Sequence, residues 1–135
     1  MYEKFEHGAD IGIKGRGPTL NEAFAETAKA MFDVMVDVGN IELKKEIRIS
    51  VSAPNKEELL VEFLNQLLTQ ADLNNMVFKK FVVHISDNKL QALVFGEELD
   101  PQRHNIKTEV KAATYSMLKI GKENGGYFAQ CVIDV

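Results

Sequence analysis

Two aspartates near opposite ends of the chain carry the clearest chemistry in this sequence. Asp10 follows Gly8-Ala9 and precedes a short alternating apolar stretch, and Asp134 is the penultimate residue. Val135 adds its α-carboxylate one peptide unit beyond Asp134. Three oxygen donors on two backbone ends are the kind of ligand that a hard divalent cation prefers. Spacing alone also allows a plainer interpretation, in which Asp10 forms an Asx-turn and Asp134 is solvated at a strand end.

The three histidines do not extend this set into a zinc site. His7 lies three residues before Asp10, His84 and His104 are remote in sequence, and Cys131 is the only cysteine. These spacings match no structural zinc signature, and histidine is a poor ligand for a hard cation. We expect His7 to be a hydrogen-bonding neighbour of the aspartate site.

A nucleophile with its own base is not recognisable in the sequence. Ser86 stands two residues after His84, but no acid and no oxyanion loop accompany the pair. A hydrolase or transferase needs such a constellation within reach of its substrate. We therefore predict that the chain is not itself an enzyme.

Chain length and net charge limit the number of domains and the kinds of molecule that the protein can bind. The 135 residues with 45% hydrophobic content suit one compact domain, residues 1–135. Sixteen basic and 20 acidic residues give a formal net charge of −4. Tight nucleic-acid binding requires clustered Lys and Arg that release counterions. We therefore expect no direct tight nucleic-acid binding, and we expect any RNA to be reached through a protein partner.

The cellular compartment is suggested by cysteine usage and by apolar runs. A single cysteine, Cys131, cannot form an internal disulfide, so a reducing cytoplasm is expected. No apolar run approaches the roughly 20 residues of a membrane span, and the first residues lack the apolar core of a signal peptide. The expected location is cytoplasmic, without membrane attachment.

Two helices are predicted, and each begins at a capping pair. Thr19 stands three residues before Glu22, and Asn55 stands three residues before Glu58. Apolar residues then recur at i, i+3 and i+4, which places one apolar stripe on each helix. The stripes contain Leu20, Ala23, Phe24, Thr27, Ala28, Met31, Phe32 and Met35 in the first helix, and Leu59, Leu60, Phe63, Leu64, Leu67, Leu68 and Ala71 in the second.

About six strands are predicted, and most are joined by hairpins. The expected strands are residues 11–13, 47–53, 81–85, 90–94, 109–120 and 127–134. Turn residues at 87–88 and at 124–126 separate the last four into two hairpins. Two helices with single apolar stripes can cover one sheet and leave another sheet opposite. The predicted fold is therefore α+β, with two mostly antiparallel sheets and a layer of two helices.

Glycines at positions 12, 15 and 17 precede the first helix and invite comparison with phosphate-binding loops. Their spacing fits neither the Walker pattern nor the dinucleotide pattern, and no Lys-Ser/Thr pair follows. We interpret residues 15–17 as a turn that ends the first strand.

Residues 96–108 form the longest stretch without periodicity and are expected to be a solvated loop. Lys107, Glu109 and Lys111 follow at alternate positions, so they would share one face of an extended strand. A mixed-charge strip of this kind can hold a protein partner.

Three segments together resemble the archease family. They are Phe5-Glu6-His7-Gly8-Ala9-Asp10-Ile11-Gly12-Ile13, the run from Leu99-Asp100-Pro101 through residues 107–115, and the terminal Ile133-Asp134-Val135. The resemblance covers essentially the whole chain, with two departures. Gly8 stands where Thr is more usual, and Ser116 stands where His is common.

The resemblance implies a metal site and a role in RNA processing. In the family, the aspartates equivalent to Asp10 and Asp134 bind a divalent metal, usually Ca²⁺, and the terminal residue, here Val135, contributes. The implied partner is the RNA-splicing ligase of tRNA splicing, which joins 3′-phosphate or 2′,3′-cyclic-phosphate ends. The protein would promote guanylylation of that ligase and its multiple turnover. A chaperone-like modulator of a tRNA methyltransferase and an independent metal-dependent hydrolase are the alternatives.

Overall fold

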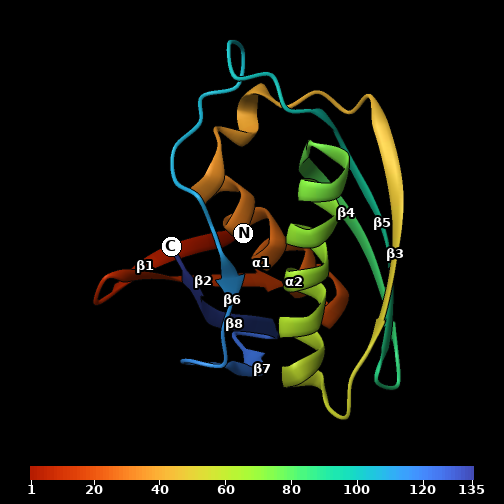
Figure 1. Cartoon of the computed structure of the whole chain (residues 1–135). Coiled ribbons are helices and arrows are strands. Elements are labelled where there is room, and N and C mark those ends of the chain that lie inside the picture. Colours follow the sequence, from red (N-terminus) through yellow and green to blue (C-terminus); the bar gives the residue numbers. More distant parts are fainter.

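The computed structural model describes residues 1–135 and has two sheets with two helices between them (Figure 1). The larger sheet has the order β1-β2-β8-β6, and β7 also pairs with β8. Its strands are β1 (Tyr2–His7), β2 (Asp10–Gly17), β6 (Ala112–Ala113), β7 (Lys119–Glu123) and β8 (Gly126–Asp134). The smaller sheet has the order β3-β5-β4, and its strands are β3 (Lys45–Ser52), β4 (Met76–Ser86) and β5 (Lys89–Glu98). All pairs are antiparallel, which confirms the predicted fold class.

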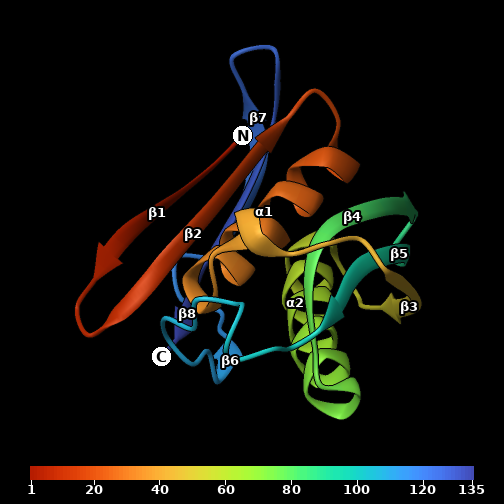
Figure 2. The same cartoon turned by 90° about the horizontal axis from the view of Figure 1, so that it is seen from above.

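The helices fill the space between the sheets (Figure 2). α1 (Leu20–Met35) contacts β2 and β8 on one side and β4 on the other, and α2 (Lys56–Asn74) contacts β3, β4 and β6. A short 3₁₀ turn, η1 (Val38–Asn40), follows α1. The rings of Phe32 and Phe78 lie 5.3 Å apart, edge to face, and join α1 to β4 in the core. Neither helix combines the length and the apolar composition that crossing a lipid bilayer requires.

Both helices begin where the capping pairs predict. The hydroxyl of Thr19 accepts a hydrogen bond from the backbone N–H of Glu22 at 3.2 Å. The side-chain oxygen of Asn55 accepts one from the N–H of Glu58 at 2.8 Å. Each bond satisfies a backbone donor that the first helical turn leaves free, so local chemistry fixes these two starts.

The turn predicted at residues 15–17 is wrong, because β2 continues to Gly17 and pairs with β8 along its length. Gly15 allows α1 to pack directly on the strand backbone. A Cβ atom at this position would lie 2.3 Å from the backbone nitrogen of Thr27 and 2.5 Å from the carbonyl oxygen of Ala23. The glycine therefore serves close packing between helix and strand, as glycines within strands often do.

The single strand predicted over residues 109–120 is also wrong, since it is divided into β6 and β7. The hydroxyl of Thr114 donates a hydrogen bond to the carbonyl of Val132 at 2.8 Å, and the N–H of Val132 donates to the carbonyl of Ser116 at 3.0 Å. Met117 then takes a positive φ of 54°. The resulting irregularity interrupts the strand, although both pieces pair with β8 as the predicted hairpin requires.

The stretch 96–108 is not a solvated loop as expected, because β5 continues to Glu98 and the residues after it are anchored. Glu97 and His104 are only 3% and 2% exposed. The Glu97 carboxylate accepts hydrogen bonds from the backbone N–H of Glu42 at 2.6 Å, from Nε2 of His104 at 3.0 Å, and from the guanidinium of Arg103. Arg103 also donates to the carbonyl of Asn40 at 2.8 Å. These bonds fasten the stretch to η1 and to the segment between η1 and β3.

The three donors around Glu97, chiefly the Arg103 guanidinium, lower the pKa of this carboxyl to about 2 from its ordinary 4.5. Ionised Glu97 therefore stabilises the fold above about pH 4.5, and this contribution is lost as the pH falls toward 2. We expect Glu97→Gln to flatten the pH dependence of the free energy of unfolding in this window. Urea denaturation between pH 2 and 6 measures it. Glu98→Gln, at an exposed neighbouring position, is the control and should retain the wild-type profile.

Candidate functional site

The two predicted metal-binding aspartates are brought together at one end of the larger sheet. β2 pairs with β8 in a register whose last pair is Ile11 with Ile133, and Asp10 and Asp134 are the next residues along these strands. Opposed residues of an antiparallel pair project to the same face. The backbone N–H of Val135 donates a hydrogen bond to Oδ1 of Asp10 at 3.3 Å, across 125 residues of sequence. The carboxyl end of the chain thus lies beside the start of β2 (Figure 1).

The backbone around Asp134 is held from both sides. β2 lies on one side, and on the other Ala112 of β6 pairs with Asp134 while the N–H of Lys111 donates to the Asp134 carbonyl at 2.8 Å. Asp10, Asp134 and Val135 are each partly buried. The sheet therefore fixes the main chain of the site, and its three residues remain partly accessible to solvent.

No protein cation neutralises these carboxylates. The ion pairs of the structure include neither Asp10 nor Asp134. Negative groups on opposed strand positions repel one another, and a bound cation removes that repulsion. The donor set is all oxygen, which fits a hard cation such as Ca²⁺.

The protein side chains alone do not form a closed cage. No group of three or more His, Cys, Asp or Glu side chains is placed to hold a metal ion. Two aspartate side chains and one main-chain carboxylate would hold a cation only in part. Ca²⁺ binds six to eight oxygens, so the remaining positions would be taken by waters or by oxygens of a partner.

His7 lies where the sequence analysis predicts, next to the site. It pairs with Asp10 across the β1–β2 turn, and its side chain is exposed. Gly8 in this turn has a φ of 60°, which glycine adopts without strain. The hydrogen-bonding role of His7 stays a prediction.

The mixed-charge strip is smaller than predicted. Lys107 is engaged within the protein, because its ammonium donates to the carbonyl of Asp33 at 2.8 Å and lies 3.5 Å from the Asp33 carboxylate. Glu109 and Lys111 are exposed and form no ion pair. Only these two members remain available to a partner.

Two features were not predicted from the sequence, one at the site and one in the stretch 97–104. Lys111 supports Asp134 through its backbone N–H and not through its charge, and no residue pattern signals a main-chain contact. The second is the hydrogen-bonded set of Glu97, Arg103 and His104. Three polar residues within eight positions of an expected loop were the only available signal.

Comparison with known proteins gives one consistent result. The model of the Archease protein family (MTH1598/TM1083) matches residues 2–135. A protein named archease from Pyrococcus abyssi is 46% identical over 140 residues, covering 99% of this chain and 98% of the relative. The archease of Sulfurisphaera tokodaii is 38% identical with the same coverage of both chains.

Solved structures agree with the sequence comparison. The solution structure of Methanobacterium thermoautotrophicum protein 1598 has a TM-score of 0.84 and 32% identity, covering 99% of this chain and 98% of the other. The crystal structure of a Thermotoga maritima protein, described as an archease and possible chaperone, has a TM-score of 0.60 at 18% identity, with 100% and 98% coverage. The latter supports the fold alone. By its sequence, this chain belongs to the archease family.

Proposed function

We propose that this protein is a non-catalytic accessory protein of the RNA-splicing ligase, which it activates through the carboxylate tip formed by Asp10, Asp134 and Val135. The observation that carries the proposal is the meeting of the first and last of these residues, 125 positions apart, at one end of the sheet. These residues are remote in the sequence but adjacent in the fold. No lysine or arginine forms an ion pair with their acidic groups. Such a tip suits binding of a cation that a partner shares.

In this role, the protein's own residues would bind the cation and hold the two strand ends in position. Asp10 and Asp134 would present oxygens from two adjacent strands, and the hydrogen bond from Val135 to Asp10 would keep the two strand ends in register. A bound divalent cation would supply positive charge beside the triphosphate during guanylylation of the ligase. The net charge of −4 favours approach to an electropositive ligase pocket that binds nucleotide and RNA.

The non-enzymatic role is supported by the surroundings of the histidines. His84 and Ser86 project from the exposed face of β4, and neither forms a hydrogen bond with the other. His104 is buried against Glu97 and is occupied on both ring nitrogens. A general base needs access to substrate, which His104 lacks.

A second candidate function is a chaperone-like modulator of a tRNA methyltransferase. The exposed apolar residues Leu73 and Ile106, 74% and 53% exposed, favour it, since exposed apolar surface is where unfolded or partner chains bind. The two functions are distinguished by the carboxylates. Ligase activation requires Asp10 and Asp134, whereas a holding function through apolar surface does not.

The test is an end-joining assay with the ligase of the same organism in limiting amount. We expect several joined products for each ligase molecule when this protein is present, and about one or fewer when it is absent. Guanylylated ligase, followed with labelled GTP, should accumulate faster with the protein. Equal turnover with and without it would contradict the proposal, and turnover of RNA by the purified protein alone would favour a hydrolase.

Extension at the two termini should have unequal effects. A tag after Val135 converts its carboxylate to a neutral amide and crowds the tip, so Ca²⁺ affinity should fall by at least about tenfold. A tag before Met1 begins at the opposite end of β1, which pairs Tyr2 with Gly15, and should be tolerated. Calorimetry with Ca²⁺ and the ligation assay compare both forms with untagged protein. Equal behaviour of all three would remove Val135 from the site.

A further inference from the structure

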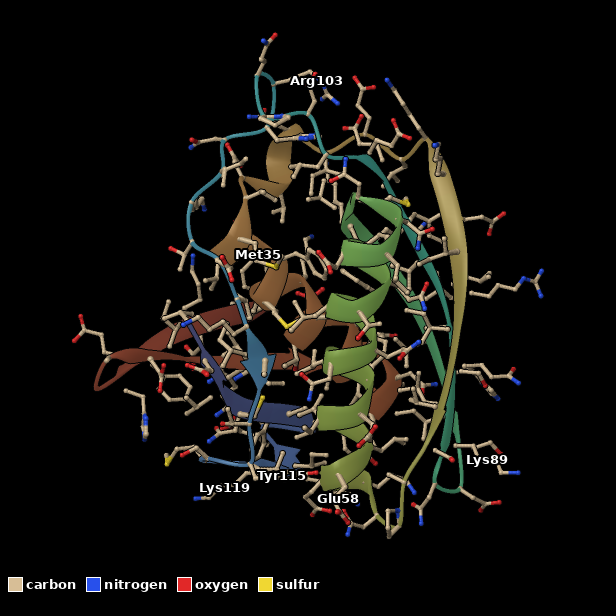
Figure 3. All side chains as sticks on the ribbon, in the orientation of Figure 1. Met35, Glu58, Lys89, Arg103, Tyr115 and Lys119 are labelled. Atoms are coloured by element: carbon tan, nitrogen blue, oxygen red, sulfur yellow. The ribbon has the colours of Figure 1, made fainter.

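The largest cavity in the structure is an open groove that the carboxylate tip does not include. It has a volume of about 840 Å³ and lies between α2, the end of α1 and the segment before β6. Its apolar lining includes Met35, Leu68, Leu73, Leu99, Ile106 and Val110. Figure 3 shows Met35 at the end of α1, beside the space between this segment and α2. Met side chains adapt their shape to different partners, so this lining can accept apolar side chains.

One side of the groove, the segment before β6, contains backbone groups without hydrogen-bond partners; we call this side and the α2 side the two banks of the groove. The N–H of Lys107 donates to the carbonyl of Met35 at 2.9 Å, and the N–H of Lys111 donates to the carbonyl of Asp134. Between them, residues 108–110 form no backbone–backbone hydrogen bond, and no side chain bonds to their backbone. Their exposure alternates, with Glu109 exposed and Val110 buried, as in a strand.

The neighbouring part of this edge is already closed. Asn65 of α2 accepts a hydrogen bond from the N–H of Ala113 at 2.8 Å and donates one to its carbonyl at 3.3 Å. A side-chain amide thus takes the place of an additional strand at Ala113. Residues 108–110 have no such substitute, so they offer an edge to which an incoming strand can pair.

The charges around the groove favour a basic occupant. Asp72 on α2 and Glu109 on the opposite bank both line it, and both are exposed and without an ion pair. Lys111 lies at the end nearest Asp134. A cationic side chain between the banks would therefore meet two carboxylates.

We propose that this groove is the docking site for an extended segment of the partner ligase that is apolar and basic. The segment would pair its backbone with residues 108–110 and place apolar side chains between Leu73 and Ile106. The inference rests on the proposed function, because the groove joins the carboxylate tip through Lys111 and the same partner would contact both. Docking in the groove would supply affinity, while the tip would act on the ligase centre.

The first test is amide hydrogen exchange of this protein alone and in complex with the ligase. In the free protein, the amides of residues 108–110 should exchange freely, whereas those of Lys107 and Lys111, already bonded, serve as internal references. Because successive N–H groups of a strand point to opposite sides, the ligase should slow exchange by at least about tenfold at those amides of 108–110 that face the groove. Unchanged exchange at these amides in a complex that still forms would overturn the proposal and leave the proposed function standing.

The second test uses variants on both banks. Leu73→Lys and Ile106→Lys should each raise the Kd for the ligase by about tenfold or more. Val82→Lys, on the outer face of the smaller sheet and 49% exposed, is the matched control and should bind normally. Asp10→Asn should bind the ligase but fail to stimulate it, which separates the groove from the tip. Melting curves check that each variant folds.

The remaining outcomes also decide the proposal. Wild-type binding by both groove variants would overturn it. Slower exchange at 108–110 in the protein alone at rising concentration would assign the groove to a second copy of this chain and would also overturn it. Absence of any complex with the ligase would reject both the groove proposal and the proposed function.

Discussion

Replacing Asp10 or Asp134 with Asn should abolish stimulation of the ligase while leaving the fold intact. Each change keeps the size of the side chain and removes one negative charge, and calcium affinity depends on ligand charge. Both positions lie at strand ends and are only partly buried, so little core packing is lost. The ligation assay with limiting ligase measures the effect. Calorimetry should show Ca²⁺ affinity at least about tenfold weaker.

The matched control is Asp87→Asn. Asp87 is exposed in the turn between β4 and β5 with a φ of 55°, which asparagine also tolerates. This variant should stimulate the ligase as the wild type does. If Asp10→Asn or Asp134→Asn also stimulates normally, the carboxylate tip is not the active part of the protein.

Gly15→Ala should be the most destabilising single-methyl change in the larger sheet. The added Cβ would lie 2.3 Å from the Thr27 nitrogen and 2.5 Å from the Ala23 oxygen, and both are helix backbone atoms that cannot rotate away. α1 must therefore move off β2. We expect the free energy of unfolding to fall by about 3 kcal/mol, at the upper end for overpacking. The melting temperature should fall by about 10 °C.

Gly39→Ala provides the comparison for this variant. Its Cβ would approach only the Asp37 side-chain oxygen, at 3.2 Å, and that carboxylate can shift. Urea denaturation of the two variants beside wild type gives the difference directly. A loss for Gly15→Ala no larger than that for Gly39→Ala would show that α1 and β2 are less tightly packed than the structure indicates.

The elements that the sequence predicts well are those fixed by neighbouring residues. The helix starts depend on Thr19 and Asn55, whose side chains bond to backbone only three residues away. The turn at Asn124 and Gly125 depends on two positive φ angles in adjacent residues. Local interactions of this kind can be predicted from one amino-acid sequence.

The errors concern residues whose role is set by remote segments. In the sequence, Gly15 resembles a turn residue. In the structure, it is a strand residue on which the backbone of α1 packs. Glu97 resembles a solvated acid, but its donors come from residues 42, 103 and 104. The break between β6 and β7 depends on the bond from the Thr114 hydroxyl to the Val132 carbonyl and on the bond from the Val132 N–H to the Ser116 carbonyl. No spacing rule contains such long-range contacts.

The same contrast between local and long-range interactions applies to the candidate site. Residue spacing alone favoured an Asx-turn at Asp10 and a solvated strand end at Asp134 over a metal site. Their adjacency follows from the pairing of β2 with β8, strands at opposite ends of the chain. Only the family resemblance indicated this in advance, because the order of strands in a sheet is a property of the whole fold.

The central position of β8 determines when the protein can mature during synthesis. β8 pairs with β2, β6 and β7, yet it leaves the ribosome after all three of these strands. Until then, β2 lacks its inner neighbour and α1 lacks part of its cover, whereas the β3–α2–β4–β5 unit is already complete in sequence. A nascent chain of this protein therefore exposes a sheet edge and apolar helix surface until β8 has emerged. Incomplete products that lack β8 share that exposure, which makes them prone to aggregation.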